Sequence, residues 1–210
     1  AMTNLLGWIG LTLVGTLVTF WPTLLRTRMD DRSEKLARQT LPILLLAIAA
    51  VDVGALVGIR WISVLGLGIY LFGLLWWGRS LLAPFRRKPP REFAPASVGV
   101  AAVWGVVALI ATGWHLLSTN DLELADGYPR LASIWVAGFL LQLVTGALSY
   151  LIPSVVGGGP RVVRTATAQM DRFATVRLVI INGGLLLWLF PLPSWVQVTV
   201  AVLVLAAFAS

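Results

Sequence analysis

The basic residues of this chain are concentrated in alternate gaps between long apolar segments. Seven apolar runs are separated by six gaps, and fourteen of the sixteen Lys and Arg residues fall in the first, third and fifth gaps. A transmembrane helix needs about 20 mainly apolar residues, and cytoplasmic loops carry an excess of Lys and Arg. The pattern predicts a helical integral membrane protein, because the strands of a membrane barrel are shorter and alternate polar with apolar residues.

The apolar runs predict an all-α fold, a polytopic bundle of about seven transmembrane helices that forms one domain over residues 1–210. The expected helices cover residues 4–25, 40–59, 61–83, 96–118, 131–156, 173–191 and 194–210. Only 12% of the residues are charged, against about 25% in soluble domains. Apolar segments begin and end almost at the two termini, so we expect this domain to be part of a longer polypeptide.

The charge distribution also predicts an orientation. The basic residues of the three gaps are Arg26, Arg28, Arg32, Lys35 and Arg38; Arg79, Arg86, Arg87, Lys88 and Arg91; and Arg161, Arg164, Arg172 and Arg177. The other gaps hold only Arg60 and Arg130. We therefore expect a multi-pass protein of the cell membrane, with the basic loops in the cytoplasm, the N-terminus outside and the C-terminus inside. The net charge of +7 then lies beside anionic lipid headgroups, so the expected partner is the lipid bilayer and not a nucleic acid.

Several residue types mark the expected helix ends. Seven Trp residues near these ends predict an interfacial belt: Trp61, Trp76, Trp77, Trp114, Trp135, Trp188 and Trp195. Four prolines predict an irregular third loop: Pro84, Pro89, Pro90 and Pro95. The Gly-Gly-Gly-Pro segment at 157–160 is expected to end the fifth helix. Residues 32–38 are expected to form either a surface helix or a solvated charged turn.

The sequence is poor in side chains that carry chemistry. It has no Cys, which excludes disulfides, thiolate metal sites and Cys nucleophiles. Its single His is His115, at the outer end of the fourth expected helix. This residue is either a haem or metal ligand, or an interfacial His hydrogen-bonded to a loop or to water. One His cannot form a metal centre alone, so we assign no metal site and no catalytic residue.

Asp52 is the only carboxylate well inside an expected helix. An ionisable residue within the membrane is costly and is a functional candidate for that reason. The alternative is a structural acid that is paired or bridged by water. The expected partner of Asp52 is Arg60 or a polar residue of another helix.

Two helices carry polar stripes. The fifth has Gln142, Thr145, Gly146, Ser149, Tyr150 and Pro153 at helical spacing, and the first has Thr12, Gly15, Thr16 and Thr19. Small and hydroxyl-bearing residues allow helices to approach closely, so such a stripe is expected either to pack against a neighbour or to line a cofactor. The candidate cofactor-binding residues are His115, Gln142, Thr145, Ser149 and Tyr150. Asn4 and Asn182 are expected to form hydrogen bonds between helices.

Two stretches resemble a known family. The first runs from Asn-Leu-Leu-Gly-Trp at residue 4 to Leu-Leu-Arg-Thr-Arg at residue 28. The second runs from Gly-Ala-Leu-Ser-Tyr-Leu-Ile-Pro at residue 146 through Gly-Gly-Gly-Pro to Met170-Asp171-Arg172. Together they resemble the N-terminal membrane region of actinobacterial copper oxidases of the multicopper oxidase and copper nitrite reductase type. The region is also distantly similar to subunit I of haem-copper oxidases.

This resemblance implies a membrane-embedded module of a larger copper-dependent oxidoreductase. The module would anchor the enzyme and relay electrons from quinol or haem, without being catalytic itself. Copper would lie in an adjoining domain, and upstream helices of the same polypeptide would be further partners, with haem as a second cofactor in the membrane. Members of the family carry a His shortly before the Asn-Leu-Leu-Gly-Trp stretch. In the numbering of this chain, that His would precede Ala1. The residues alone leave two other functions open: a transporter or channel for a small solute or ion, and a purely structural anchor.

Overall fold

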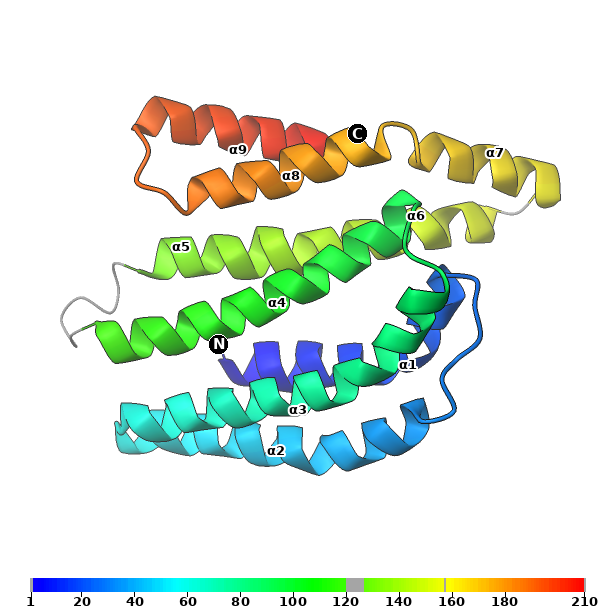
Figure 1. The fold of residues 1–210 in the computed structure, drawn as a ribbon. Helices are drawn as coiled ribbons and strands as arrows, with labels where there is room; N and C mark the ends of the chain where they lie inside the picture. The colour runs from blue at the N-terminus through cyan, green and yellow to red at the C-terminus, as the bar shows by residue number, and fades with distance from the viewer. Residues whose placement is uncertain (1, 120–126, 157, 210) are drawn as a thin grey trace. The chain divides into compact units, whose positions relative to one another are not determined.

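The computed structural model is helical and describes residues 2–119, 127–156 and 158–209 (Figure 1). These residues contain no strand, which confirms the all-α prediction. The elements are η1 (Asn4–Gly10), α1 (Leu11–Leu24), α2 (Ser33–Val57), α3 (Arg60–Arg87), α4 (Phe93–Ser118), α5 (Tyr128–Ser133), η3 (Ile134–Leu141), α6 (Gln142–Val156), α7 (Pro160–Met170), α8 (Ala174–Trp188) and α9 (Ser194–Ala209), where η1 and η3 are π-helical.

Five helical segments of the described chain are long and apolar enough to cross a membrane. They are Asn4–Leu24, Ser33–Val57, Arg60–Arg87, Phe93–Ser118 and Tyr128–Val155, and they match the first five predicted helices. The last two predicted helices correspond to α8 and α9, which have 15 and 16 residues. At 1.5 Å per residue these helices are about 22–24 Å long, shorter than the hydrocarbon core of about 30 Å. By length and composition alone, the described chain therefore provides five membrane-spanning helices.

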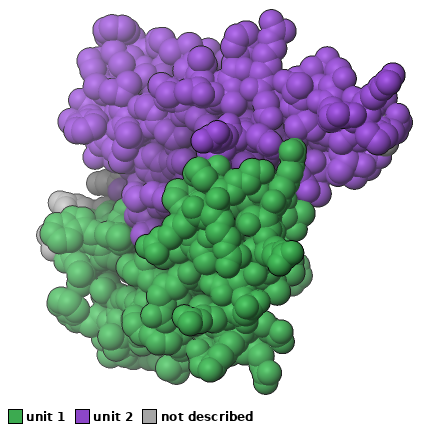
Figure 2. Space-filling view, turned by 45° about the vertical axis from the view of Figure 1, so that its right-hand side comes forward, with its two compact units in different colours: residues 1–89, 109–124 green, residues 90–108, 125–210 purple. Residues whose placement is uncertain are grey.

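The helices form two compact units, coloured separately in Figure 2. Unit 1 contains residues 1–89 and 109–124, and unit 2 contains residues 90–108 and 125–210. Helix α4 therefore contributes its residues up to Ala108 to unit 2 and the remainder to unit 1.

Unit 1 is organised around the antiparallel pair α2 and α3. Gly58 ends α2 in the left-handed conformation, with φ 74°, and α3 begins two residues later. Small residues bring the two helices into close contact: a methyl group at Gly66 would lie 2.8 Å from the carbonyl oxygen of Ala47. Beside this contact, the hydroxyl of Ser63 donates a hydrogen bond of 3.1 Å to the carbonyl of Val51. Close backbone approach of this kind is the usual basis of helix association in lipid.

The first helical segment, η1 together with α1, packs on this pair. One side chain of α3 and one of α1 each donate a hydrogen bond to a backbone carbonyl of the other segment. The buried hydroxyl of Tyr70 donates to the carbonyl of Leu6 over 2.8 Å, and the indole N–H of Trp21 donates to the carbonyl of Leu81 over 3.1 Å. Leu6 is paired with Tyr70 and Trp21 with Leu81, so the residue numbers increase in the same direction along both segments. The first segment therefore runs parallel to α3, as consecutive up-and-down crossings require.

Unit 2 is organised around the antiparallel packing of α4 on η3 and α6. A methyl group at Gly138 would lie 2.9 Å from the ring of Trp104, and one at Gly146 would lie 2.9 Å from Cβ of Ser97. Trp104 also donates its indole N–H to the side-chain oxygen of Asn182 on α8, over 2.7 Å. The bond confirms the predicted interhelix role of Asn182, whereas Asn4 is exposed.

Within each unit, the basic gaps come together at one end. In unit 1 the guanidinium of Arg87 donates to the carbonyl of Arg28 over 3.4 Å, which joins the first and third gaps. In unit 2 the backbone N–H of Phe93 donates to the carboxylate of Asp171 over 2.8 Å, which joins the third and fifth gaps. The alternation of basic gaps seen in the sequence is therefore a spatial segregation of charge in each unit.

The third gap is shorter than predicted. Pro84 lies inside α3, and Pro95 lies in the first turn of α4, which leaves residues 88–92 between the helices. Proline fits the first turn of a helix because its missing N–H would have no partner there. Residues 33–38 form the first turns of α2, so neither a separate surface helix nor a turn is present there.

The seven tryptophans expected at helix ends differ in exposure, and Trp76 and Trp188 are intermediate. Trp61, Trp114 and Trp195 are more than 70% exposed and lie near helix ends, as expected for an interfacial belt. Trp77 and Trp135 are buried and belong to the packed interior.

Substituting Gly66 with Ala is expected to destabilise the α2–α3 pair, since the added methyl meets the backbone of α2. Overpacking of this kind costs about 1–3 kcal/mol. Gly68→Ala is the matched control, because a methyl group there meets nothing within 4 Å. The apparent melting temperature of the detergent-purified chain should fall for Gly66→Ala and stay unchanged or rise for Gly68→Ala. Equal melting temperatures for the two variants would contradict the close contact.

Candidate functional site

Asp52, the acid predicted to lie within the membrane, is half-buried and lies between one and two turns before the end of α2. Its carboxylate accepts a hydrogen bond of 2.8 Å from the hydroxyl of Thr3, at the start of the first helical segment. The sequence predicted either Arg60 or a polar residue of another helix as the partner of Asp52, and Thr3 is a polar residue of another helix. Arg60 instead donates a hydrogen bond to the carbonyl of Thr119. Asp52 thus ties the start of the first segment to the end of the second.

His115, the single histidine, lies in the last turn of α4 and is half-buried. Its Nδ1 lies 3.0 Å from the hydroxyl of Thr119, one turn further on. Among the described residues, no three His, Cys, Asp or Glu side chains come together as they would around a metal ion. The geometry at His115 is that of a histidine bonded to its own helix end.

The polar stripe of α6 faces α4. Gln142, Gly146 and Ser149 are buried, and the hydroxyl of Ser97 on α4 donates to the backbone carbonyl of Gln142 over 2.8 Å. The hydroxyls of Thr145 and Ser149 bond to carbonyls of their own helix, Leu141 at 2.9 Å and Thr145 at 2.7 Å. The fourth candidate on this helix, Tyr150, is half-buried. Gln142, Gly146 and Ser149 therefore pack against α4, and the hydroxyls of Thr145 and Ser149 are satisfied along their own helix.

Gln142 differs from the other members of the stripe. Its side chain is fully buried, and neither its amide oxygen nor its amide nitrogen has a hydrogen-bond partner. The other buried side-chain atoms of the described residues without a partner are single atoms, Thr40 Oγ1 and Trp77 Nε1. A buried polar group without a partner costs about 1–3 kcal/mol. Among the described residues, Gln142 is thus the side chain with two buried polar atoms that lack a partner.

The stripe of the first helix points outward. Thr12, Gly15, Thr16 and Thr19 are exposed. The hydroxyls of Thr16 and Thr19 bond along their own helix, for example from Thr16 to the carbonyl of Thr12 over 2.9 Å. A hydroxyl satisfied in this way can face lipid without a polar partner. Within unit 1, no described helix buries this stripe.

The turn between α7 and α8 forms a polar junction that the sequence interpretation missed. Asp171 accepts the N–H of Phe93, the first residue of α4, and so caps that helix. Arg177 is buried, lies 3.9 Å from the centre of the Phe93 ring, and donates to the carbonyls of Met170 and Ala207, each over 3.2 Å. The negative charge of Asp171 attracts the positive charge of the Arg177 guanidinium. The sequence contained one sign of this junction, because Asp171 is the only acidic residue in the fifth gap, whose other charged residues are arginines.

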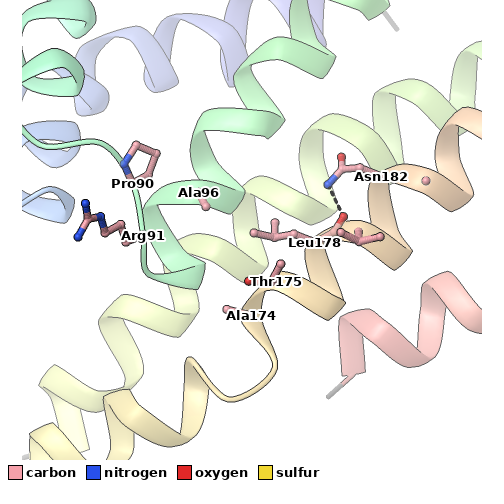
Figure 3. A pocket seen from close by; sticks show the side chains of 9 residues that line it. Pro90, Arg91, Ala96, Ala174, Thr175, Leu178 and Asn182 are labelled. Carbon is pink, nitrogen blue, oxygen red and sulfur yellow. Dashed lines mark hydrogen bonds between the residues drawn. The ribbon is translucent and has the colours of Figure 1, made fainter.

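An open pocket of about 600 Å³ lies beside this junction (Figure 3). Its lining residues come from the segment just before α4, from α4 and from α8: Pro90, Arg91, Ala96, Ala174, Thr175, Leu178, Val179, Asn182 and Gly183. In Figure 3 the guanidinium of Arg91 points away from Thr175 and Leu178. The Asn182 amide is engaged with the carbonyl of Leu178 over 2.8 Å. The surface that remains is mainly apolar and suits a hydrocarbon chain.

No family model, curated protein or solved structure matches this chain.

Replacing Asp171 tests the capping of α4. Asp171→Ala removes the acceptor for the Phe93 N–H and should cost about 0.5–2 kcal/mol, whereas Asp171→Asn retains an acceptor oxygen and should keep most of that stability. Thermal denaturation in detergent would measure both. If the two variants lose the same stability, the charge of Asp171 beside Arg177 is the important term and the cap is not.

Proposed function

We propose that this chain is the membrane-embedded module of a larger copper-dependent oxidoreductase, which it anchors in the bilayer and supplies with electrons from quinol or haem. Three observations support the proposal: five apolar helices of membrane-spanning length, the family resemblance of residues 4–28 and 146–172, and one buried amide without a partner. The copper ligands belong to an adjoining domain of the longer polypeptide, and the chemistry of substrate oxidation or reduction takes place there.

The proposed topology has seven transmembrane helices, with α8 and α9 crossing as a hairpin. Both helices expose large apolar side chains: Val179, Leu186 and Leu187 on α8, and Val198, Val202 and Leu205 on α9. Such side chains need a hydrocarbon environment, and a short helix is accommodated when the bilayer thins locally. The alternation of basic gaps then places loops one, three and five in the cytoplasm, the N-terminus outside and the C-terminus inside.

Gln142 is the residue proposed to contact the electron donor. Its amide provides one acceptor oxygen and two N–H donors, which complement a quinol hydroxyl or a quinone carbonyl. Thr145, Ser149 and Tyr150 lie on the same helix within two turns. If haem is the donor, His115 would supply one imidazole to hold it, and any further ligand would come from the upstream helices.

A transporter or channel for a small solute or ion is the alternative function, and Asp52 is the observation that favours it. The carboxylate accepts a hydrogen bond from Thr3, is only half-buried, and lies near the C-terminal end of α2. Solute flux in proteoliposomes that is abolished by Asp52→Asn would favour this alternative. A third function, a purely structural anchor, predicts neither flux nor redox activity.

The topology is testable with single cysteines, because the sequence has none of its own. Cysteines replacing Tyr128 and Ser194 should react with a membrane-impermeant maleimide in intact cells, since both positions are proposed to face outward. Cysteines replacing Asp30 and Lys88 should react only after permeabilisation. If the Ser194→Cys variant behaves like the Asp30→Cys variant, α8 and α9 do not cross the membrane.

The proposed donor site is testable with Gln142→Leu in the longer native polypeptide. Leucine has a similar volume and removes an unpaired polar group, so thermal stability should stay the same or rise. Electron transfer from a quinol to copper should fall at least tenfold, as monitored by copper absorbance, and the reduced-minus-oxidised spectrum would report any haem. Unchanged electron transfer would reject Gln142 as a donor contact and favour the structural anchor.

A further inference from the structure

Helix α7 is an additional helix within the fifth basic gap. It covers Pro160–Met170, 11 residues, and none of them is buried. Gly158 and Gly159 precede it with φ 84° and φ 87°, a conformation that glycine adopts at little cost, and Pro160 occupies its first position. The helix therefore has defined boundaries, although it contributes no residue to the interior of the protein.

The residues of α7 divide cleanly between two faces. At about 100° per residue, Val162, Val163, Ala166 and Met170 lie within one arc of about 100°, called here the apolar arc. The opposite face carries Arg161, Arg164, Thr165 and Ala168. Val162 is 46% exposed, and the other three residues of the apolar arc are partly exposed. The structure thus leaves an apolar helix face incompletely covered, directly opposite two arginines.

The charge of α7 indicates which kind of partner covers its apolar arc. The helix has two arginines and no acidic residue, and Arg172 follows it closely. It also lies in the gap that Asp171 joins to the other basic gap of unit 2. An amphipathic helix with arginines opposite a narrow apolar arc fits a bilayer surface, where the apolar residues enter the acyl boundary and the cations meet lipid phosphates.

We propose that α7 lies on the membrane surface, with its apolar arc at the acyl boundary and Arg161 and Arg164 bound to anionic phospholipid headgroups. The proposal rests on the membrane location in the proposed function and adds a specific lipid class to it. Because α7 lies between α6 and α8, binding to lipid there would fix the depth at which both helices enter the bilayer.

Spin labels on single cysteines test this proposal in the full chain reconstituted in nanodiscs. The bilayers contain phosphatidylcholine alone or with phosphatidylglycerol, and the labelled variants are Ala166→Cys in the apolar arc and Ala168→Cys on the opposite face. Leu75→Cys, at an exposed position of α3, reports membrane insertion independently. The readout is the relative accessibility of each label to oxygen, which concentrates in lipid, and to a water-soluble nickel chelate.

With phosphatidylglycerol, the label at position 166 should be accessible mainly to oxygen and the label at 168 mainly to nickel. Replacing Arg161 and Arg164 with Gln should raise nickel accessibility at position 166 at least twofold. If both α7 labels are accessible to nickel while the label at 75 is in lipid, the proposal fails and the membrane location stands. If the label at 75 is accessible to nickel, the membrane location fails too.

Two further outcomes also overturn the proposal. A label at position 166 that neither oxygen nor nickel reaches would show that protein, and not lipid, covers the apolar arc. Accessibility that is the same in both lipid mixtures, and unchanged by the Gln substitutions, would show that the arginines do not bind anionic headgroups.

Discussion

The scarcity of hydrogen-bond partners between long apolar helices is the constraint on which this structure depends. A polar group between helices apolar enough to cross a membrane needs an internal partner, and this chain uses backbone carbonyls as acceptors. Tyr70, Ser63 and Trp21 each donate to a carbonyl of a neighbouring helix. These bonds set the axial position of one helix against the next, while small residues such as Gly66 allow the approach that the bonds require. Packing and hydrogen bonding therefore specify the same arrangement.

The sequence predicted the long helices well because bilayer thickness imposes a length that is visible in composition. It also identified Asn182 as a link between helices, since an amide in lipid needs a partner. It could not identify partners for the two polar stripes: periodicity defines a face, but not whether another helix covers it, so the stripes of α6 and α1 look alike and only that of α6 is packed. Helix α7 was missed because its arginines were read as loop charge, although its apolar residues follow helical spacing.

Whether a polar side chain has a hydrogen-bond partner within the chain bears on its function. Asp52, Asn182 and the hydroxyls of α6 all have partners within the chain, as scaffold residues do. Gln142 has none for either amide atom, although it lies in the same stripe. Leucine would fit there at lower cost, so this amide lowers the stability of the fold unless a group from outside the chain bonds to it. The candidate donor site therefore rests on an energetic exception and not on the polarity of the stripe.

The cap on α4 has a consequence for biosynthesis. Phe93 and Asp171 are 78 residues apart, so the first amide of α4 is made long before the carboxylate that accepts its hydrogen bond. At a synthesis rate of about 5–20 residues per second, the delay is about 4–16 s. During that interval the start of α4 depends on water or lipid phosphate as its acceptor. Unit 2 can therefore complete its folding only after the turn that follows α7 has left the ribosome.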